Sequence, residues 1–363
     1  MSTIDNQEKQ YVGLLIGTAI GDAIGLPREG LTPKRARRLF GSKIRHSFLV
    51  LPYFKRLGIC SDDTDHLVLT AFSLLKSLPD QNSDFFAREL TCQIRKWFLS
   101  CPPGIGMATI KASLKLLLGV SYKKSGVFSA GNGAVMRAPI IGAFYACNFE
   151  KMHMLLKIST QITHTDPKAF EGSLCIALAA SILIKSKPDT APITEFFNTV
   201  YPLIKGEELK NSLLLTQESL LNAESAELYT QKLGLAKKGV TGYVNHTVPV
   251  VIYCWLRYFN DYTETVTQII RLGGDTDTNA AIVGALSGIT VGEEGIPEEW
   301  INQTINWPLS ISFLRKLARA LALSETKNHT QTPILIFPFL FFKNLISFPI
   351  IIFHGFRRLL PPY

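Results

Sequence analysis

The segment Gly13-Leu14-Leu15-Ile16-Gly17-Thr18-Ala19-Ile20-Gly21-Asp22-Ala23-Ile24-Gly25 places a glycine at every fourth position. On a helix, this spacing puts the glycines on one face, where they allow a second helix to approach closely. A membrane-spanning helix is excluded because the apolar run is too short and Asp22 interrupts it. The segment therefore predicts a closely packed helix of a soluble protein.

Helical periodicity continues from residue 11 to about residue 323, and strand-like alternation is scarce. Glycine- and proline-rich turn signals separate the helical segments. The clearest apolar repeats at helical spacing are 64–78, 84–99, 107–118, 152–162, 170–185 and 248–259. We therefore expect an all-α protein with a single compact domain of about a dozen helices. This domain is expected at residues 11–325, after a polar segment at 1–10 and before an apolar extension at 326–363.

The chain has 363 residues, of which 47% are hydrophobic and 18% are charged, and this is a globular composition. Its formal net charge of +9 favours polyanionic partners, namely phosphates, nucleic acid or an anionic membrane surface. A basic surface that keeps the protein soluble explains the charge equally well. The six cysteines form no CxxC pair, and the N-terminus does not resemble a signal peptide. We therefore expect a cytoplasmic protein in a reducing compartment.

The strongest local signal for chemistry is Ser61-Asp62-Asp63-Thr64-Asp65, at the expected start of a helix. Acidic and hydroxyl residues at such a position are ordinary helix caps, because they accept hydrogen bonds from free N–H groups and complement the helix dipole. Taken alone, the motif favours capping over a functional site.

A second acidic turn changes that balance. The segment Gly273-Gly274-Asp275-Thr276-Asp277-Thr278 again places carboxylates and hydroxyls at a helix start, and both carboxylates can reach one point from a turn made by glycines. The two clusters offer only oxygen ligands, which Mg²⁺ and Mn²⁺ prefer, whereas zinc would usually recruit Cys or His. Carboxylates brought together repel unless cations lie between them. If the clusters meet, we expect two divalent ions.

Three weaker signals accompany the acidic turns. Glu29 lies in a Pro-Arg-Glu-Gly turn that can present its carboxylate to the same centre, although a solvated loop acid explains it as well. The glycine-rich turn around Asn132 can bind phosphate through backbone N–H groups, or it can be only a turn. His164 precedes a helix-start signal at Asp166 and Pro167, and it fits either a ligand contact or a polar loop position.

Taken together and in this order, these segments resemble the ADP-ribosylglycohydrolase family. The resemblance covers about residues 11–307, and the two acidic motifs in the right order make it specific. The matching motifs are GLLIGTAIGDAIGLPREG from residue 13, SDDTDH from 61, SAGNGAVMR from 129, THTDPKAFEG from 163 and GGDTDTNAAIVGALSG from 273.

The resemblance implies an all-α fold with a binuclear Mg²⁺ or Mn²⁺ centre at the base of a cleft. It implies hydrolysis of the glycosidic bond between ADP-ribose and an acceptor. By position, the implied metal ligands are Ser61, Asp62, Asp63, Asp275, Asp277 and Thr278. The implied catalytic residues are Asp62, Asp63 and Glu29. The implied substrate-binding residues are Ser129, Gly131, Asn132, Gly133, Met136 and His164.

The hypothesis assigns a chemical role to each group. Asp62 or Asp63 accepts a proton from the attacking water, and the glycine loop together with basic residues between Arg28 and Arg45 holds the diphosphate. One departure from the family pattern is Ser61, where Thr is usual. Ser retains the hydroxyl, so it can still coordinate a cation.

Two segments need a separate interpretation. Residues 28–56 are basic and poor in helical period, which predicts a long surface loop or a short helical excursion. The tail, PILIFPFLFFKNLISFPIIIFHGFRRLLPPY at residues 333–363, is strongly apolar, and the family does not explain it. Lys343, Pro338 and Pro349 interrupt the tail, so a single membrane span is disfavoured. An interfacial or re-entrant membrane anchor, a buried extension that covers the domain, and a degenerate C-terminus all stay open.

The expected partner is an ADP-ribosylated protein or a small-molecule ADP-ribose conjugate. A nucleic acid acceptor, peripheral membrane contact through the tail, and the oligomeric state stay open. Two other functions compete with this one: a non-catalytic ADP-ribose-binding module, and an immunity-type hydrolase that reverses a toxin's modification. A phosphatase-like two-metal enzyme is disfavoured, because such sites usually include His.

Overall fold

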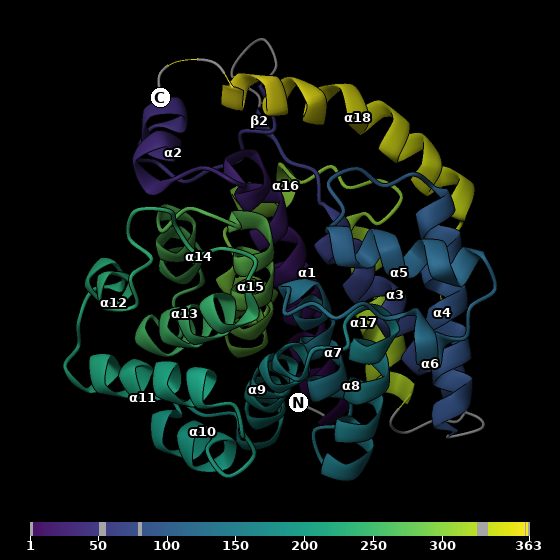
Figure 1. Cartoon of the computed structure of the whole chain (residues 1–363), viewed down its shortest axis with the longest axis horizontal. Coiled ribbons are helices and arrows are strands. Elements are labelled where there is room, and N and C mark those ends of the chain that lie inside the picture. Colours follow the sequence, from purple (N-terminus) through teal and green to yellow (C-terminus); the bar gives the residue numbers. More distant parts are fainter. Residues whose placement is uncertain (1–2, 51–55, 79–81, 325–332, 360, 362–363) are drawn as a thin grey trace.

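The computed structural model describes residues 3–50, 56–78, 82–324, 333–359 and 361, and helices dominate it (Figure 1). The expected all-α class is confirmed, with more helices than the dozen predicted. The helices are α1 (Thr3–Gly25), α2 (Pro33–Phe40), α3 (Asp62–Ser77), α4 (Ser83–Leu99), α5 (Met107–Leu117), α6 (Tyr122–Ser125), α7 (Ala138–Phe144), α8 (Phe149–Thr163), α9 (Pro167–Ser186), α10 (Ile193–Val200), α11 (Glu207–Leu221), α12 (Ala226–Lys232), α13 (Val244–Arg257), α14 (Tyr262–Arg271), α15 (Thr276–Val291), α16 (Glu298–Asn302), α17 (Ile311–Ser324) and α18 (Phe337–Leu359).

Shorter elements complete the structure. Strands β1 (Leu49–Val50) and β2 (Arg56–Leu57) form an antiparallel pair. The 3-10 turns are η1 (Leu26–Arg28), η3 (Asn132–Arg137) and η4 (Glu293–Gly295). From Thr3 onward the polar N-terminal segment belongs to α1, and the boundary predicted at 325/326 lies outside the described residues.

The central feature of the fold is the antiparallel pair α1 and α15, which lie side by side in the middle of the molecule (Figure 1). A Cβ atom added at Gly17 would lie 2.2 Å from the carbonyl oxygen of Gly284, and one at Gly13 would lie 2.0 Å from that of Gly288. No side chain fits at these contacts, so the glycine spacing sets how closely the helices approach.

This pair brings the end of α1 next to the start of α15. The hydroxyl of Thr276 donates a 2.8 Å hydrogen bond to the carbonyl of Gly25. The turn before α15 uses left-handed backbone, with φ of 69° at Gly273 and 86° at Gly274, which glycine adopts without strain. Gly274 then exchanges backbone hydrogen bonds with the segment that follows η1. The second acidic turn therefore lies directly beside Glu29.

Within the basic segment 28–56, the described residues contain α2, β1 and the first residue of β2. Arg28 departs from the surface position expected for this segment, because its side chain is buried. Its guanidinium donates to the carbonyls of Arg45 at 3.5 Å and Lys43 at 3.3 Å, and it lies over the ring of Phe40. Burial lowers the pKa of Arg28 to about 10.

Two helices within the described ranges are long and apolar enough to cross a membrane, by length and composition. The first, α9, is a core helix, since 78% of its apolar stretch is buried in the protein. The second, α18, is only 28% buried and lies across one end of the domain (Figure 1).

Polar contacts fix the inner face of α18 to the domain. The Lys343 ammonium lies 3.1 Å from the Asp65 carboxylate. The side-chain amide of Asn344 donates to the carbonyl of Ser100 at 2.9 Å. The ring Nε2 of His354 lies 2.8 Å from the carbonyl of Phe48. Helix α18 is therefore an extension that packs on the domain, and its outer face remains exposed.

Candidate active site

The two acidic turns meet at the carboxylate of Asp63. The hydroxyl of Thr278 donates a 3.1 Å hydrogen bond to Asp63 Oδ2, although the two residues are 215 positions apart. The hydroxyl of Ser61 also lies 3.1 Å from this oxygen. The structure therefore joins the two remote clusters that the sequence singled out.

The first turn is built by Asp22, which the sequence analysis treated only as an interruption of an apolar helix. Its carboxylate accepts hydrogen bonds from the backbone N–H groups of Ser61 (2.9 Å) and Thr64 (3.1 Å), and from the Thr64 hydroxyl (2.6 Å). The Ser61 hydroxyl accepts from the N–H of Asp63. Burial raises the pKa of Asp22 to about 6 despite these bonds. Ser61 and Asp22 thus cap α3, and capping does not require the side chain of Asp62.

The second turn is tied to the glycine-rich loop. Asp275 occupies the cap position of α15, yet its side chain makes no capping hydrogen bond. Its Oδ2 instead accepts a 2.7 Å hydrogen bond from the side-chain amide of Asn132. That amide also donates to the Thr247 hydroxyl at 3.0 Å, and the Asn132 N–H donates to the carbonyl of Gly242. These bonds hold the loop against the acidic centre.

The carboxylates of the acidic residues lie close enough to repel one another. Burial, followed by the neighbouring carboxylates, holds the pKa values of Asp62, Asp63 and Asp277 well above their ordinary value. Glu29 is among the charges that raise the pKa of both Asp62 and Asp277. The predicted Glu29 therefore belongs to the same cluster as the two turns. Such a group is costly to ionise without a compensating cation.

The chemistry of the donors fits a hard divalent cation. The buried atoms Asp63 Oδ1 and Asp277 Oδ1 accept no hydrogen bond from any residue that the structure describes. Within that part of the chain, no three acidic, histidine or cysteine side chains converge tightly enough to form a metal cage alone. The hydroxyl oxygens of Ser61 and Thr278 at the meeting point are the additional donors that a cation would need.

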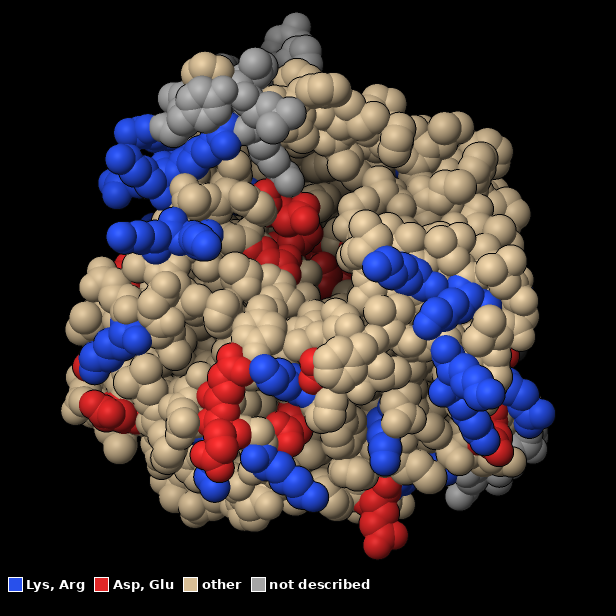
Figure 2. Space-filling model, viewed as in Figure 1, with Lys and Arg blue, Asp and Glu red and all other residues tan. Residues whose placement is uncertain are grey.

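A cavity of about 530 Å³ opens above these residues, and we call it the glycine-loop cavity. Figure 2 shows acidic side chains at the bottom of a hollow near the middle of one face. All six predicted substrate-binding residues line this cavity: Ser129, Gly131, Asn132, Gly133, Met136 and His164. Five predicted acidic-site residues also line it: Glu29, Asp62, Asp275, Asp277 and Thr278. Asp63 does not line it but accepts a hydrogen bond from the lining residue Thr278, and Ser61 lines a neighbouring cavity.

His164 supports the glycine-rich loop from one side. Cβ atoms added at Gly131 and Gly133 would each lie 3.2 Å from its ring, so the loop passes close to the imidazole. Burial, and then the charge of Arg137, lower the pKa of His164 to about 3, which keeps the ring neutral. Arg137 is buried and donates to the hydroxyl and carbonyl of Ser159 and to the hydroxyl of Thr163.

The basic residues between Arg28 and Arg45, which the sequence hypothesis places at the diphosphate, lie outside the lining of the glycine-loop cavity. Of the described residues between Arg28 and Arg45, Glu29 and Gly30 line the glycine-loop cavity, but none of the basic residues does. Arg28 in particular turns inward. Among the residues that the structure describes, the basic side chain that lines this cavity is Lys238, on the loop that also places Thr241 and Gly242 there. Sequence reasoning missed Lys238 because no local motif marks it. Its place depends on a tertiary contact, in which the N–H of Asp275 donates to the carbonyl of Val240 at 2.7 Å.

Comparison with known proteins agrees with this geometry. A model of the ADP-ribosylglycohydrolase family matches residues 3–331. The chain is 29% identical over 298 residues to an uncharacterized protein of Archaeoglobus fulgidus, covering 81% of this chain and 91% of that one. It is 27% identical over 206 residues to ADP-ribosylhydrolase ARH3 of Bos taurus, covering 48% of this chain and 54% of that enzyme, about half its length.

A solved structure described as an ADP-ribosylglycohydrolase-related protein complex shares the fold. Its TM-score is 0.64 at 22% identity, and the match covers 88% of this chain and 98% of that one. The fold and the relatives define the class of protein as an all-α glycosyl hydrolase. The chain belongs to the ADP-ribosylglycohydrolase family, which confirms the resemblance seen in its motifs. Helix α18 lies beyond the residues that the family model matches.

Proposed function

We propose that this protein hydrolyses the glycosidic bond that joins ADP-ribose to an acceptor, and that it does so with two Mg²⁺ or Mn²⁺ ions. The observation that carries the proposal is the hydrogen bond between Thr278 and Asp63, which unites the two acidic turns beside the glycine-loop cavity. A non-catalytic ADP-ribose-binding module would need the cavity and the loop, but it would not need a crowded group of carboxylates.

The residues that would hold the two ions are Ser61, Asp62, Asp63, Asp275, Asp277 and Thr278. When bound, such ions lower the pKa of a coordinated water and bind sugar hydroxyls. Charge balance supports this assignment, because burial and mutual repulsion raise the pKa values of Asp62, Asp63 and Asp277. Divalent cations would keep these carboxyl groups ionised.

The other roles follow from position. Asp62 lines the cavity with a partly exposed side chain, so its carboxylate would accept a proton from an attacking water in that space. Carboxylates beside the distal ribose stabilise the positive charge that develops as the bond breaks. The loop around Asn132 binds the diphosphate through N–H groups, and Lys238 adds a positive charge.

A panel of conjugates tests the function. The full-length protein is incubated with ADP-ribose linked to arginine, serine, a nucleic acid phosphate and a small metabolite, with Mg²⁺, with Mn²⁺ or with a chelator. Chromatography then measures free ADP-ribose. Release that depends on the metal supports the proposal and names the acceptor class. Binding of ADP-ribose without release from any conjugate would instead establish a binding module.

We also propose a cytoplasmic location with peripheral contact to an anionic membrane. All six cysteines are free, and three of them are buried, as in proteins of reducing compartments. The outer face of α18 exposes large apolar side chains, including Phe342 (52%), Ile346 (69%) and Phe353 (63%). The basic helix α2 lies next to the C-terminal half of α18, because Phe40 stacks on His354. An apolar face beside basic side chains is typical of interfacial helices.

Vesicle sedimentation tests this location. The protein should sediment with phosphatidylglycerol vesicles more than with phosphatidylcholine vesicles, and increasing salt should weaken the binding. A Phe342→Ser/Ile346→Ser variant should stay in the supernatant. If the wild-type protein stays soluble and monodisperse with both kinds of vesicle, the membrane proposal fails. A stable dimer in light scattering would assign the apolar face to a second copy of the chain.

A further inference from the structure

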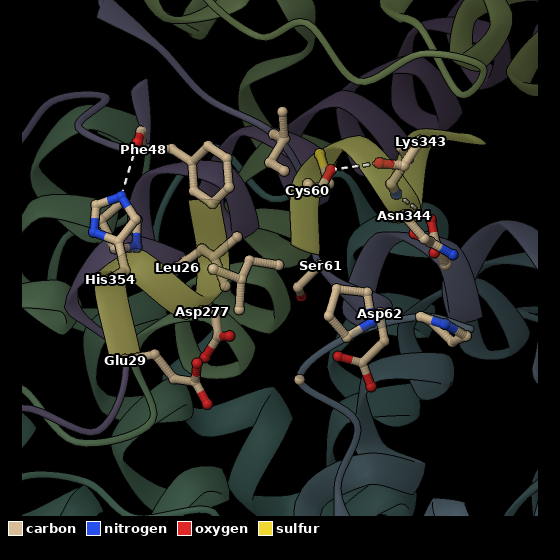
Figure 3. A pocket seen from close by; sticks show the side chains of 18 of the residues that line it. Leu26, Glu29, Phe48, Cys60, Ser61, Asp62, Asp277, Lys343, Asn344 and His354 are labelled. Atoms are coloured by element: carbon tan, nitrogen blue, oxygen red, sulfur yellow. Dashed lines mark hydrogen bonds and ion pairs between the residues drawn. The ribbon is translucent and has the colours of Figure 1, made fainter. Parts of the chain in front are cut away.

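A second cavity lies on the other side of the acidic residues, beneath α18 (Figure 3). We call it the roof cavity. It has a volume of about 230 Å³ and shares Glu29, Asp62, Gly104 and Asp277 with the glycine-loop cavity. The carboxylates therefore stand at the junction of two cavities. One is built by residues of the family match, and the other is closed by the C-terminal extension beyond that match.

The walls of the roof cavity are mostly hydrocarbon. Leu26 and Phe48 line it from the domain, and Ile351 lines it from α18. Ile59 and the pair Pro102-Pro103 add further apolar surface.

The polar groups that α18 contributes to this cavity are engaged with the protein. Lys343 pairs with Asp65, and Asn344 donates to Ser100. The Ser347 hydroxyl donates to the carbonyl of Lys343, and His354 contacts the carbonyl of Phe48. The roof thus presents a compensated charge and satisfied hydrogen bonds, so it offers little to a charged ligand.

We propose that the roof cavity is the acceptor subsite, and that it selects conjugates whose acceptor presents an uncharged ring or a branched aliphatic group. This inference rests on the proposed function. With the ADP moiety in the glycine-loop cavity and the ribose at the carboxylates, the group on the anomeric carbon extends into the space beyond them. That space is the roof cavity.

The volume sets the size of the acceptor group. Because one water takes roughly 30 Å³ of liquid, a space of this volume corresponds to about eight waters. A single six-membered ring therefore fits, since an apolar cavity of roughly 150 Å³ is enough to hold benzene. Burial of such a group against Phe48 and Ile351 removes apolar surface from water and favours binding.

A binding experiment tests this without relying on turnover. The probe is an analogue of ADP-ribose with a phenyl group joined to the anomeric carbon through a carbon–carbon bond, which the enzyme cannot hydrolyse. Calorimetry on the full-length protein compares it with ADP-ribose. We expect the wild-type protein to bind the phenyl analogue about tenfold more tightly.

Three variants test the role of the roof cavity: two of them fill it, and the third is a matched control. Ile351→Phe enlarges a lining residue, and Gly355→Leu adds a side chain at a lining position where a Cβ meets no atom within 4 Å. The control, Ile352→Phe, makes the same change one residue along, at a side chain that is 40% exposed and does not line the cavity. The filling variants should lose the preference for the phenyl analogue and keep their affinity for ADP-ribose within about twofold.

The possible results distinguish a failure of the acceptor subsite from a failure of the proposed hydrolysis. If the wild-type protein binds the phenyl analogue no more tightly than ADP-ribose, or if both filling variants keep the preference, the acceptor subsite is refuted even when the conjugates are cleaved. If the phenyl preference follows the cavity while neither the panel nor an O-phenyl conjugate of ADP-ribose is hydrolysed, the subsite stands and the catalytic proposal fails.

Discussion

The ammonium group of Lys343 lies 3.1 Å from the carboxylate of Asp65, and both side chains are buried. Asp65 Oδ2 also accepts a 3.1 Å hydrogen bond from the indole N–H of Trp97. Burial alone would lower the pKa of Lys343, but Asp65 and the neighbouring acidic groups outweigh that effect and raise it. The charge that interrupts the apolar tail thus binds α18 to the first turn of α3, which also carries Asp62 and Asp63.

Removal of this lysine should strongly destabilise the protein. Lys343→Met leaves the buried Asp65 carboxylate without a compensating positive charge, and such a change costs about 3–5 kcal/mol. Denaturant unfolding measures the loss. The matched control is Lys9→Met, because Lys9 pairs with Glu294 at 3.1 Å on the surface, where an ion pair contributes at most about 1 kcal/mol. The double variant Asp65→Asn/Lys343→Met should recover part of the loss. Equal losses in Lys343→Met and Lys9→Met would contradict this account.

Neutralising either acidic turn should abolish hydrolysis. Asp62→Asn and Asp277→Asn keep the size of the side chain but remove a charge from the centre, and each should lower metal-dependent release of ADP-ribose at least about a hundredfold. Circular dichroism checks that both variants fold. The exposed Glu207 provides the control, since Glu207→Gln removes a carboxylate that lines neither cavity and should leave turnover unchanged. Turnover like that of the wild-type protein in Asp62→Asn or Asp277→Asn would refute these assignments.

A methyl group between α1 and α15 should not be tolerated. In Gly17→Ala, the new Cβ would lie 2.2 Å from the carbonyl oxygen of Gly284, so the helices must separate, at a cost of about 3 kcal/mol or more. Thermal unfolding measures the change. At Gly355, inside α18, an added Cβ meets no atom within 4 Å, so Gly355→Ala should be neutral or stabilise by up to about 1 kcal/mol. A Gly17→Ala protein as stable as the wild type would disprove the close contact.

Stability should fall at mildly acidic pH, in part because of His46. Burial lowers the pKa of this imidazole from its ordinary 6.5 to about 4, even though the carbonyl of Trp300 favours protonation. Between these two values the unfolded chain binds a proton that the folded chain does not bind, so the free energy of unfolding decreases as the pH falls. At pH 5 the contribution of His46 is a loss of about 2 kcal/mol relative to pH 8.

The variant His46→Asn isolates this effect. Denaturant unfolding at pH 8 and pH 5 should show the variant losing about 2 kcal/mol less than the wild-type protein over this interval. Subtracting one protein from the other removes the titration of the other buried histidines, such as His164, whose pKa burial also lowers. If both proteins lose stability equally, His46 is not the titrating group.

Local sequence was sufficient for the class of fold and for most of the candidate site. Helical periodicity, the glycine spacing before Gly25 and the two acidic turns are each written in consecutive residues, and backbone geometry relates such residues directly. The chemistry of the ligands was likewise readable, because clusters that contain only carboxylates and hydroxyls favour hard cations. These features predicted the helices, the acidic turns and the loop around Asn132.

Tertiary structure alone decided how these parts meet. The contact between Thr278 and Asp63, the capping of α3 by Asp22 and the place of Lys238 in the glycine-loop cavity each join segments far apart in the chain. Lys343 could be read only as a break in an apolar run until its partner was known. The physical reason is that the environment of a side chain, and hence its pKa and its role, depends on which distant helix packs against it. The local hydrophobic period of a sequence does not specify which helices pack together.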